Sequence, residues 1–376
     1  METVRGAEPR LRARLRELVE IESPSDDREA VNRAADLVVD WARELGGEVR
    51  RHPGGRFGDV VELRFGAAAG GKSVLLLGHL DTVYSMGTLA MMPWREVETE
   101  DGVRLQGPGV VDMKAGVVMA LEAIAALREL NALNRPVTLL LNPDEEVGSE
   151  VSRPHTERLA RESAAVFVLE PAQGLAYKTA RKGVGHFELT VEGVAAHAGV
   201  DFANGHSAVL EMARLVEQVS AWTDLSKGRT VNVGVIAGGT RSNVIAGQCR
   251  AEVDVRVVTM DDAALVEEMF RRLRTHDAGC KLRVEGGINR PPMERSTGTV
   301  KLFQQAQRLA AEIRIELQEA ATGGGSDGNF TAAIGVPTLD GMGAVGGGAH
   351  SPGEYVVAAH LVERTALLAG MLQADL

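Results

Sequence analysis

Short apolar runs alternate with helical patterns along the first half of the chain, and this alternation limits the possible folds more than any other feature. The runs VVELRF (60–65), SVLLLG (73–78) and VTLLLN (137–142) are typical of strands that helices cover on both faces. Helices are predicted over 10–22, from a Ser25 cap to Gly46, and over about 114–130. The segment 66–73 is interpreted as a hairpin loop. The predicted fold class is therefore α/β, with a mixed sheet flanked by helices.

A second pattern begins near residue 180, where strand and helix signals follow the order β-α-β-β-α-β. The predicted strands and helices are 183–193, 206–221, 230–239, 251–258, 261–276 and 281–287. This order is that of the α+β ferredoxin-like unit. Afterwards a helix at 297–313, a strand at 335–339 and a helix at 354–373 resume the first pattern. We therefore expect an outer domain of residues 1–179 and 288–376, and an inserted domain of residues 180–287.

Size, charge and cysteine content exclude several classes of protein. A chain of 376 residues exceeds the usual size of a single core, and a net charge of -11 disfavours a non-specific nucleic-acid binder. No segment approaches the roughly 18 apolar residues of a membrane span, and the charged N-terminus lacks a signal-peptide core, so we expect a cytoplasmic protein. Cys249 and Cys280 are the only cysteines, which disfavours a disulfide framework and a thiolate metal site. Any metal ion must be held by His, Asp and Glu.

His79 and Asp81 form the sequence HLD directly after the apolar run 73–78. In open α/β sheets, ligands bind at the C-terminal ends of strands. Residues i and i+2 of an extended chain face the same side, so the Asp81 carboxylate can hold one imidazole nitrogen while the other meets a metal ion. A strand-end histidine beside an ordinary turn aspartate is the alternative interpretation.

Further carboxylates follow other predicted elements. Asp112 lies in GPGVVDMKAG, where it can cap the helix that starts near Lys114 or bridge two metal ions about 3.5–4 Å apart. The segment NPDEEVGS (142–149) places three consecutive acids after a buried strand, with no base nearby. Glu145 and Glu146 are neighbours and point in different directions, so one can bind a metal ion while the other accepts a proton from water. Solvated loop acids are the alternative.

Two more candidates lie after a strand and in a glycine-rich loop. Glu170 ends the apolar run of VFVLEP, and His350 lies in GAVGGGAHSPGEYV, where glycines allow close approach to a ligand. A plain surface loop is the alternative for His350. Two histidines and three carboxylates thus lie at strand or loop ends, namely His79, Asp112, Glu146, Glu170 and His350. This donor set suits zinc, cobalt or manganese rather than copper or iron–sulfur clusters.

Five ordered motifs, GHLDTV, GVVDMKAG, NPDEEVGS, VLEP and GGGAHSP, resemble those of the dinuclear zinc peptidase family M20. The resemblance covers essentially the whole chain, including the inserted domain. The family includes glutamate carboxypeptidases of the carboxypeptidase G type, acetylornithine deacetylase, succinyl-diaminopimelate desuccinylase and aminoacylases. It implies two Zn²⁺ per subunit, with Co²⁺ or Mn²⁺ as possible substitutes.

The resemblance also assigns roles to the candidate residues. One metal ion would be held by His79, Asp112 and Glu170, and the other by Asp112, Glu146 and His350. Asp81 would orient His79, Glu145 would be the general base, and the Asp112–Met113 peptide would be cis. The inserted domain of the family mediates dimerisation, and a histidine of its AAHAG motif reaches the partner's active site to polarise the scissile carbonyl. That residue is His197 here, so we expect a homodimer.

The glutamate carboxypeptidase branch of the family resembles this chain in KTARKGVG, INRPPME and GGGSDGNF (323–330). Glu170 favours carboxypeptidases and deacylases, because dipeptidases and aminopeptidases of the family often carry Asp there. Arg290 is the candidate for binding the α-carboxylate of the substrate, since a guanidinium group matches a carboxylate at two points. The predicted substrate-binding residues are Arg290, Asn243, Lys178, Arg181, Gly325 and Ser326. Lys178 and Arg181 can equally be solvated surface charges.

The predicted function is release of a C-terminal amino acid, preferably glutamate, from a small peptide or N-acyl amino acid. The nearest alternative is a deacylase that removes an N-acyl group from a neutral or basic amino acid. An inactive binding protein on the same fold is disfavoured because Glu145 and all five ligands are present. A structural metal protein is disfavoured because such zinc sites are typically closed and rich in cysteine.

Overall fold

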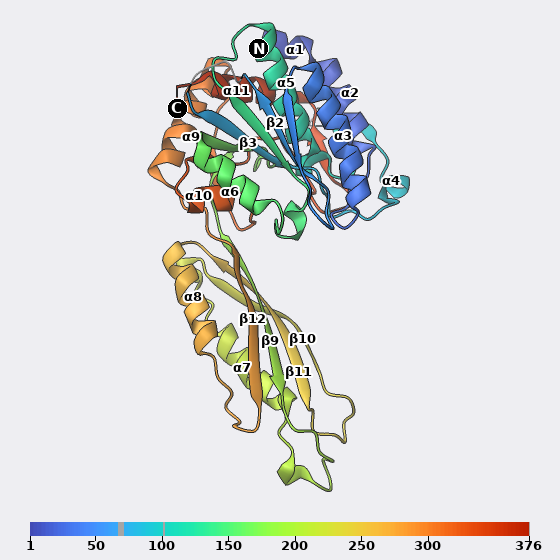
Figure 1. Cartoon of the computed structure of the whole chain (residues 1–376), viewed down its shortest axis with the longest axis vertical. Helices are drawn as coiled ribbons and strands as arrows, with labels where there is room; N and C mark the ends of the chain where they lie inside the picture. Colours follow the sequence, from blue (N-terminus) through green and yellow to red (C-terminus); the bar gives the residue numbers. More distant parts are fainter. Residues whose placement is uncertain (67–70, 101, 376) are drawn as a thin grey trace. The chain divides into compact units, whose positions relative to one another are not determined.

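The computed structural model describes residues 1–66, 71–100 and 102–375, and it divides into two compact units (Figure 1). The first unit comprises Met1–Ala180, Arg295–Thr322 and Ser326–Leu376, and the second comprises Arg181–Glu294 and Gly323–Gly325. The sequence placed the return to the first unit at residue 288. The structure places it later, because Ile288 and Arg290 still pair with the neighbouring strand of the second unit.

A six-stranded mixed sheet forms the centre of the first unit. In spatial order its strands are β1 (Glu48–His52), β2 (Val60–Phe65), β6 (Val137–Asn142), β3 (Ser73–His79), β7 (Ser163–Val168) and β14 (Thr338–Leu339). Strand β3 pairs in parallel with β6 and β7, whereas β2 is antiparallel to both of its neighbours. The predicted mixed sheet is confirmed.

The predicted hairpin between β2 and β3 is wrong, because β6 lies between these two strands. All six residues of β6 are buried, so this strand takes a central position in the sheet rather than an edge. Residues 67–70 of the predicted loop lie outside the described residues.

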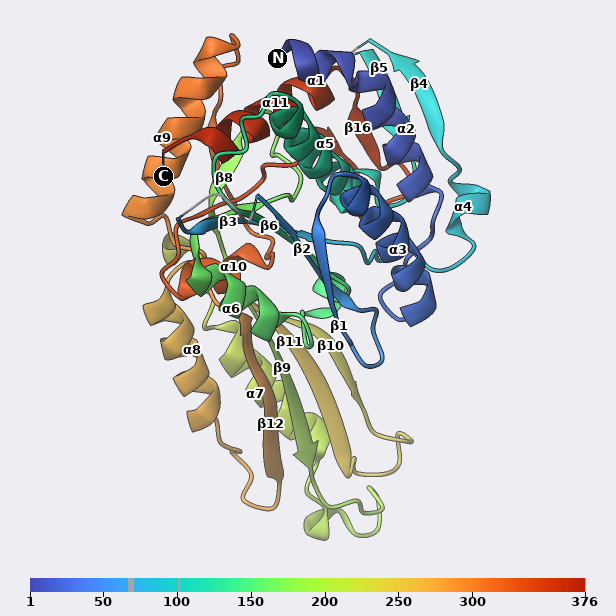
Figure 2. The same cartoon turned by 45° about the horizontal axis from the view of Figure 1, so that its top comes forward.

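Helices cover both faces of the sheet, as Figures 1 and 2 show. The helices of this unit are α1 (Glu2–Gly6), α2 (Glu8–Val19), α3 (Arg28–Glu44), α4 (Thr88–Met91), α5 (Ala115–Glu129), α6 (Arg153–Glu162), α9 (Thr297–Glu312), α10 (Gly328–Ala333) and α11 (Ala359–Gln373), of which the short α4 buries no residue. Side chains alternate along β3, so Leu76 packs in the core with α2, α3, α5 and α11, while Leu75 and Leu77 pack in a second core with α6. The continuous apolar runs of the sequence reflect this burial on both faces.

Two helix boundaries differ from the predictions. Helix α3 is capped by Asp27, which accepts a hydrogen bond from the backbone of Ala30, and not by Ser25. Helix α11 begins at Ala359 rather than near 354, because β16 (Tyr355–Val357) precedes it. This strand belongs to a small sheet that the sequence did not predict, in the order β15 (Gly346–Gly347), β16, β5 (Gly102–Gln106) and β4 (Arg95–Thr99). A further pair joins β8 (Tyr177–Arg181) and β13 (Glu319–Thr322).

The second unit has the predicted ferredoxin-like order of elements. They are β9 (Gly183–Glu192), α7 (Ala208–Ser220), β10 (Thr230–Gly238), β11 (Gln248–Val257), α8 (Met260–Arg272) and β12 (Lys281–Arg290). The strands form an antiparallel sheet in the order β10-β11-β9-β12. Alternate residues of β9 and β11 form one core with α7 and α8, which lie on the same face of this sheet (Figure 2). Among the described residues, no helix is both long enough and apolar enough to cross a bilayer.

A buried ion cluster joins α2 to α5, the helix that follows Asp112. Glu122 of α5 is 1% exposed and accepts hydrogen bonds from Arg10 Nη2 at 2.6 Å and from Arg14 Nη1 at 2.9 Å. Arg14 is itself buried, with a second partner in the exposed Glu44. The cluster therefore holds α2 against α5, next to the segment that carries Asp112.

We expect Glu122→Ala to lower the free energy of unfolding by about 3 kcal/mol, because the Arg14 guanidinium loses its buried carboxylate. Urea unfolding followed by circular dichroism measures the change. The matched control is Glu129→Ala, which removes an exposed carboxylate from the same helix. A loss for Glu122→Ala no larger than that of the control contradicts the role of the cluster.

Candidate metal centre

Three parallel strands bring the candidate ligands to one edge of the central sheet. His79 is the last residue of β3 and pairs with Asn142, the last residue of β6, and β7 runs in the same direction. The acids Glu145 and Glu146 follow β6, and Glu170 follows β7. Because the C-terminal ends of parallel strands meet at the same edge, residues distant in sequence become neighbours there.

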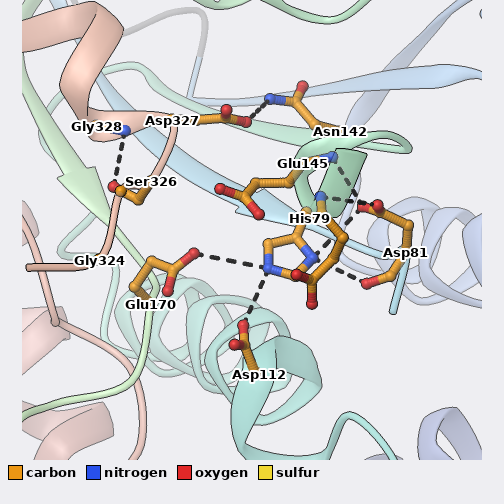
Figure 3. A network of polar contacts seen from close by, with 12 residues as sticks. His79, Asp81, Asp112, Asn142, Glu145, Glu170, Gly324, Ser326, Asp327 and Gly328 are labelled. Carbon is orange, nitrogen blue, oxygen red and sulfur yellow. Dashed lines mark hydrogen bonds and ion pairs between the residues drawn. The ribbon is translucent and has the colours of Figure 1, made fainter. Parts of the chain in front are cut away.

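His79 lies at the middle of this group and is buried (Figure 3). Its Nε2 atom lies 3.1 Å from Asp112 Oδ1 and 3.6 Å from Glu170 Oε1. Its Nδ1 atom lies 2.9 Å from the backbone oxygen of Asp81 and 3.5 Å from the Asp81 carboxylate. The imidazole is therefore held on the Nδ1 side, which leaves Nε2 facing two carboxylates.

The carboxylate of Asp81 also fixes the segment that carries Glu145 and Glu146. Its Oδ1 atom accepts a hydrogen bond from the backbone N–H of Glu145, and Oδ2 accepts one from that of Glu146, both at 3.1 Å. The Ser25 hydroxyl donates to Oδ2 at 2.7 Å. Ser25 thus acts on the site, a role that its sequence pattern, which resembled a helix cap, did not reveal.

Asp112 lies between the two histidines. Its Oδ1 atom faces His79, and its Oδ2 atom lies 3.3 Å from His350 Nε2. Glu146 Oε2 lies 3.2 Å from the same His350 nitrogen. His350 holds a left-handed backbone conformation with φ of 62°, and the Asp112–Met113 peptide is cis. Asp112 therefore presents one oxygen to each histidine, as a carboxylate shared by two cations would.

Two sets of residues could each hold a metal ion, because the potential ligand atoms within each set lie within 4.8 Å of one another. The sets are His79 with Asp112 and Glu146, and His79 with Glu145 and Glu170. The second set contains Glu145 where the family resemblance implies Asp112. The described structure therefore brings together all five predicted ligands, the predicted base and Asp81.

The electrostatics of the group favour a bound cation. Hydrogen bonds to Asp112 and Glu146 raise the pKa of His350 to about 10. Burial opposes charge on His79, but hydrogen bonds to Asp112, Asp81 and Glu170 raise its pKa above the usual value. Burial would raise the pKa of Asp112, yet hydrogen bonds to His350 and His79 outweigh it and lower the pKa. The carboxylates that raise the pKa values of the two histidines would also attract a metal cation.

One buried oxygen provides a direct test of this donor set. Among the described residues, none donates a hydrogen bond to Glu146 Oε1, although the atom is buried. Burial also raises the pKa of this carboxyl group. An unpaired buried carboxylate oxygen is costly, and a cation would satisfy it. The residues present therefore fit a metal ion.

A second buried carboxylate, Glu354, organises the turn that presents Asp112. Its Oε1 atom accepts hydrogen bonds from the backbone N–H groups of Val111 at 2.7 Å and Asp112 at 3.1 Å. Its Oε2 atom accepts one from Gly109 at 3.1 Å and lies 2.6 Å from the Tyr84 hydroxyl. Glu354 was not among the residues predicted from the sequence. Its position four residues after His350 is the only sequence feature that could have indicated it.

The predicted substrate-binding residues divide between the two units. Lys178 and Ser326 lie in the first unit, where both contact Asp340: the Lys178 backbone pairs with it, and the Ser326 hydroxyl donates to its Oδ2 at 2.6 Å. Lys178 and Arg181 are 8% and 4% exposed. Their interpretation as solvated surface charges is therefore wrong.

The remaining candidates lie in the second unit and form two groups. Arg181 Nη1 donates to the backbone oxygen of Gly325 at 3.0 Å, and a Cβ atom at Gly325 would lie 2.7 Å from Arg290 Cδ. His197 and Asn243 form a separate, exposed group, linked by a backbone hydrogen bond from Ala198 to Asn243 at 3.0 Å. Glycine at position 325 thus permits the close approach of Arg290, while His197 belongs to a different surface.

Comparisons with known proteins agree over most of the chain. The family model described as peptidase family M20/M25/M40 matches residues 75–374. Carboxypeptidase G2 of Pseudomonas sp. (strain RS-16) is 30% identical over 372 residues, which cover 96% of this chain and 88% of the relative. Acetylornithine deacetylase of Myxococcus xanthus is 28% identical over 325 residues, covering 83% and 82%. The solved structure of aminopeptidase PepT from Bacillus cereus ATCC 10987 has a TM-score of 0.79 at 20% identity, covering 97% of this chain and 98% of that one.

We expect Glu354→Gln to weaken the binding of a divalent metal ion, with Zn²⁺ as the probe, by about 10–100-fold. The reason is that the amide would turn its NH₂ group toward two of the donors from which the carboxylate now accepts hydrogen bonds. Zinc titration against a competing chelator measures the affinity. The control is Glu363→Gln, which changes a half-buried carboxylate of α11 that contacts His360. Equal zinc affinities of Glu354→Gln and the unaltered protein would rule out a role for Glu354 in holding Asp112.

Proposed function

The chain belongs to peptidase family M20/M25/M40, and from this premise we propose that it releases a C-terminal amino acid, preferably glutamate, from a small peptide or N-acyl amino acid. The observation that carries the proposal is the convergence of five candidate metal ligands and one further carboxylate, Glu145, at one edge of the sheet. The similarity to carboxypeptidase G2 along nearly the whole chain supports the C-terminal direction of cleavage.

Two divalent metal ions are part of the proposal. One would be held by His79, Asp112 and Glu170, and the other by Asp112, Glu146 and His350. The two oxygens of Asp112 face different histidines, which supports a bridging role. Zinc suits this set of imidazole and carboxylate donors, with cobalt and manganese as substitutes. Bound ions of this kind polarise the scissile carbonyl and lower the pKa of the attacking water.

The chain's own groups would move the proton and orient the substrate. Glu145 takes the proton from the attacking water and delivers it to the leaving amine, and its backbone is held by Asp81 for that purpose. Arg290 binds the α-carboxylate of the substrate through its guanidinium group. Lys178 and Arg181 add positive charge for a substrate that carries a second carboxylate.

A deacylase acting on N-acyl amino acids is the second candidate function, favoured by the similarity to acetylornithine deacetylase. Both reactions break an amide bond with the same metal and base residues. They differ in the amino acid of the substrate, whose side chain would be acidic for the carboxypeptidase, next to Lys178 and Arg181, and neutral or basic for the deacylase.

The proposal is tested by measuring amine release by the zinc-reconstituted protein. The substrates are peptidyl and N-acyl amino acids with acidic, neutral and basic C-terminal residues. We expect C-terminal glutamate to give the highest kcat/KM. Arg290→Gln should raise the KM for that substrate about 100-fold, because a charged hydrogen-bonding partner of the carboxylate is lost. Arg283→Gln, an exposed arginine on the same strand, is the control and should change nothing. A preference for neutral or basic residues would favour the deacylase instead.

We also propose a homodimer in which His197 of one subunit stabilises the oxyanion in the site of its partner. Its exposure in the second unit, with Asn243 beside it, supports a role outside its own fold unit. The apolar Val235 and Ile236 are exposed on β10, an edge strand of the same sheet, which supports a protein interface there.

A mixture of two inactive variants tests this arrangement. Glu145→Gln alone should lower kcat by about three orders of magnitude while retaining zinc, and His197→Ala should also be strongly impaired. When both are unfolded and refolded together in equal amounts, we expect about a quarter of the normal activity, because half of the random dimers then contain one complete site. Absence of recovery in proven mixed dimers would show that His197 does not act on the partner.

A further inference from the structure

Asp327 is a buried carboxylate of the first unit that none of the roles above uses. It is 3% exposed and directly precedes α10. Its Oδ2 atom accepts a hydrogen bond from Asn142 Nδ2 at 2.6 Å, as Figure 3 shows, and its Oδ1 atom accepts one from the Ser149 hydroxyl. Asn142 and Ser149 are the first and last residues of the segment 142–149, here called the acidic loop, which carries Glu145 and Glu146. One carboxylate therefore holds both ends of this loop.

Other hydrogen bonds hold the middle of the acidic loop and close its turn. Asp81 binds the backbone at Glu145 and Glu146, in the middle of the loop. Inside the loop, the Ser149 N–H donates to the Asp144 backbone oxygen at 2.8 Å and closes a tight turn. Ser149 has a φ of 60°, a left-handed conformation that L-residues with side chains seldom adopt. Its hydroxyl bond to Asp327 helps to keep it there.

The two oxygen acceptors at position 327 match the two donors that face them. Asn142 and Ser149 both act as donors toward it, and both are fully buried. An amide at position 327 would offer one oxygen to one of these groups and its NH₂ group to the other. Either the Ser149 hydroxyl would have to accept instead of donate, or Asn142 would face a second NH₂ group at a buried position. Asn142 Nδ2 also lies 3.1 Å from the Thr156 hydroxyl, which fixes the direction of its amide.

We propose that Asp327 is a positioning residue, which holds the two ends of the acidic loop so that Glu146 faces the metal centre and Glu145 faces the scissile bond. The inference rests on the proposed function for the roles of these two glutamates. Asp327 contacts neither the substrate nor a metal ion in this scheme. Its loss should therefore change zinc affinity and kcat, while KM changes little.

The test compares Asp327→Asn, Asn142→Asp and the double variant that combines them. In the zinc-loaded protein we expect each single change to lower zinc affinity, measured by chelator competition, and kcat by about 10–100-fold. Asp327→Asn places two amides opposite each other, and Asn142→Asp places two carboxylates opposite each other. The double variant exchanges the groups, so the amide at 327 donates to the carboxylate at 142 and its oxygen still accepts from Ser149. It should recover most of both quantities.

Two further variants separate positioning from stability. Ser149→Ala removes one hydroxyl, is the mildest change to the loop and should lower zinc affinity and kcat by a smaller factor. Thr331→Val is the control: its hydroxyl donates to the Gly328 backbone at 3.0 Å and lies 2.8 Å from that of Thr338, in the same buried region but away from the loop. It should lower the thermal midpoint without changing zinc affinity or kcat.

Single variants that bind zinc and turn over substrate like the unaltered protein would overturn the inference, as would a double variant without recovery. An unaltered protein that binds two zinc ions but hydrolyses none of the substrates refutes the proposed function alone, and the zinc affinities then still decide the role of Asp327. An unaltered protein that binds no zinc overturns both.

Discussion

Parallel pairing of β3 with β6 and β7 is the constraint on which the candidate site depends. It aligns the C-terminal ends of three strands, so that His79, the acidic loop and Glu170 meet although the chain between them forms other elements. The strands themselves are held by burial of apolar residues on both faces of the sheet. The apolar core thus determines where the polar edge lies, although the polar residues of that edge are not part of the core.

The same edge concentrates carboxylates, and the protein supports them with buried acceptors. Asp81, Glu354 and Asp327 each receive two or more hydrogen bonds from backbone, hydroxyl or side-chain amide donors around the site. None of these three is a proposed metal ligand. They fix the main chain on either side of the ligands, which is how buried polar groups can orient a metal site before the ion arrives.

The inserted unit adds a different kind of surface. Its core is built from one face of an antiparallel sheet and two helices, separate from the core of the first unit. Arg290 and Arg181 gather around Gly325, which belongs to the short segment Gly323–Gly325 of the second unit, between two segments of the first unit.

The sequence by itself determined the α/β class, the ferredoxin-like insertion and the positions of the acids at strand ends, because hydrophobic period and strand length are local properties. Only the tertiary structure decided that β6 lies between β2 and β3 and that Ser25, Glu354 and Asp327 serve the site. Their hydrogen bonds join residues 56, 242 and 185 positions apart, to Asp81, Asp112 and Asn142 respectively. Such partners are chosen by the packing of whole elements, which no local pattern of residues encodes.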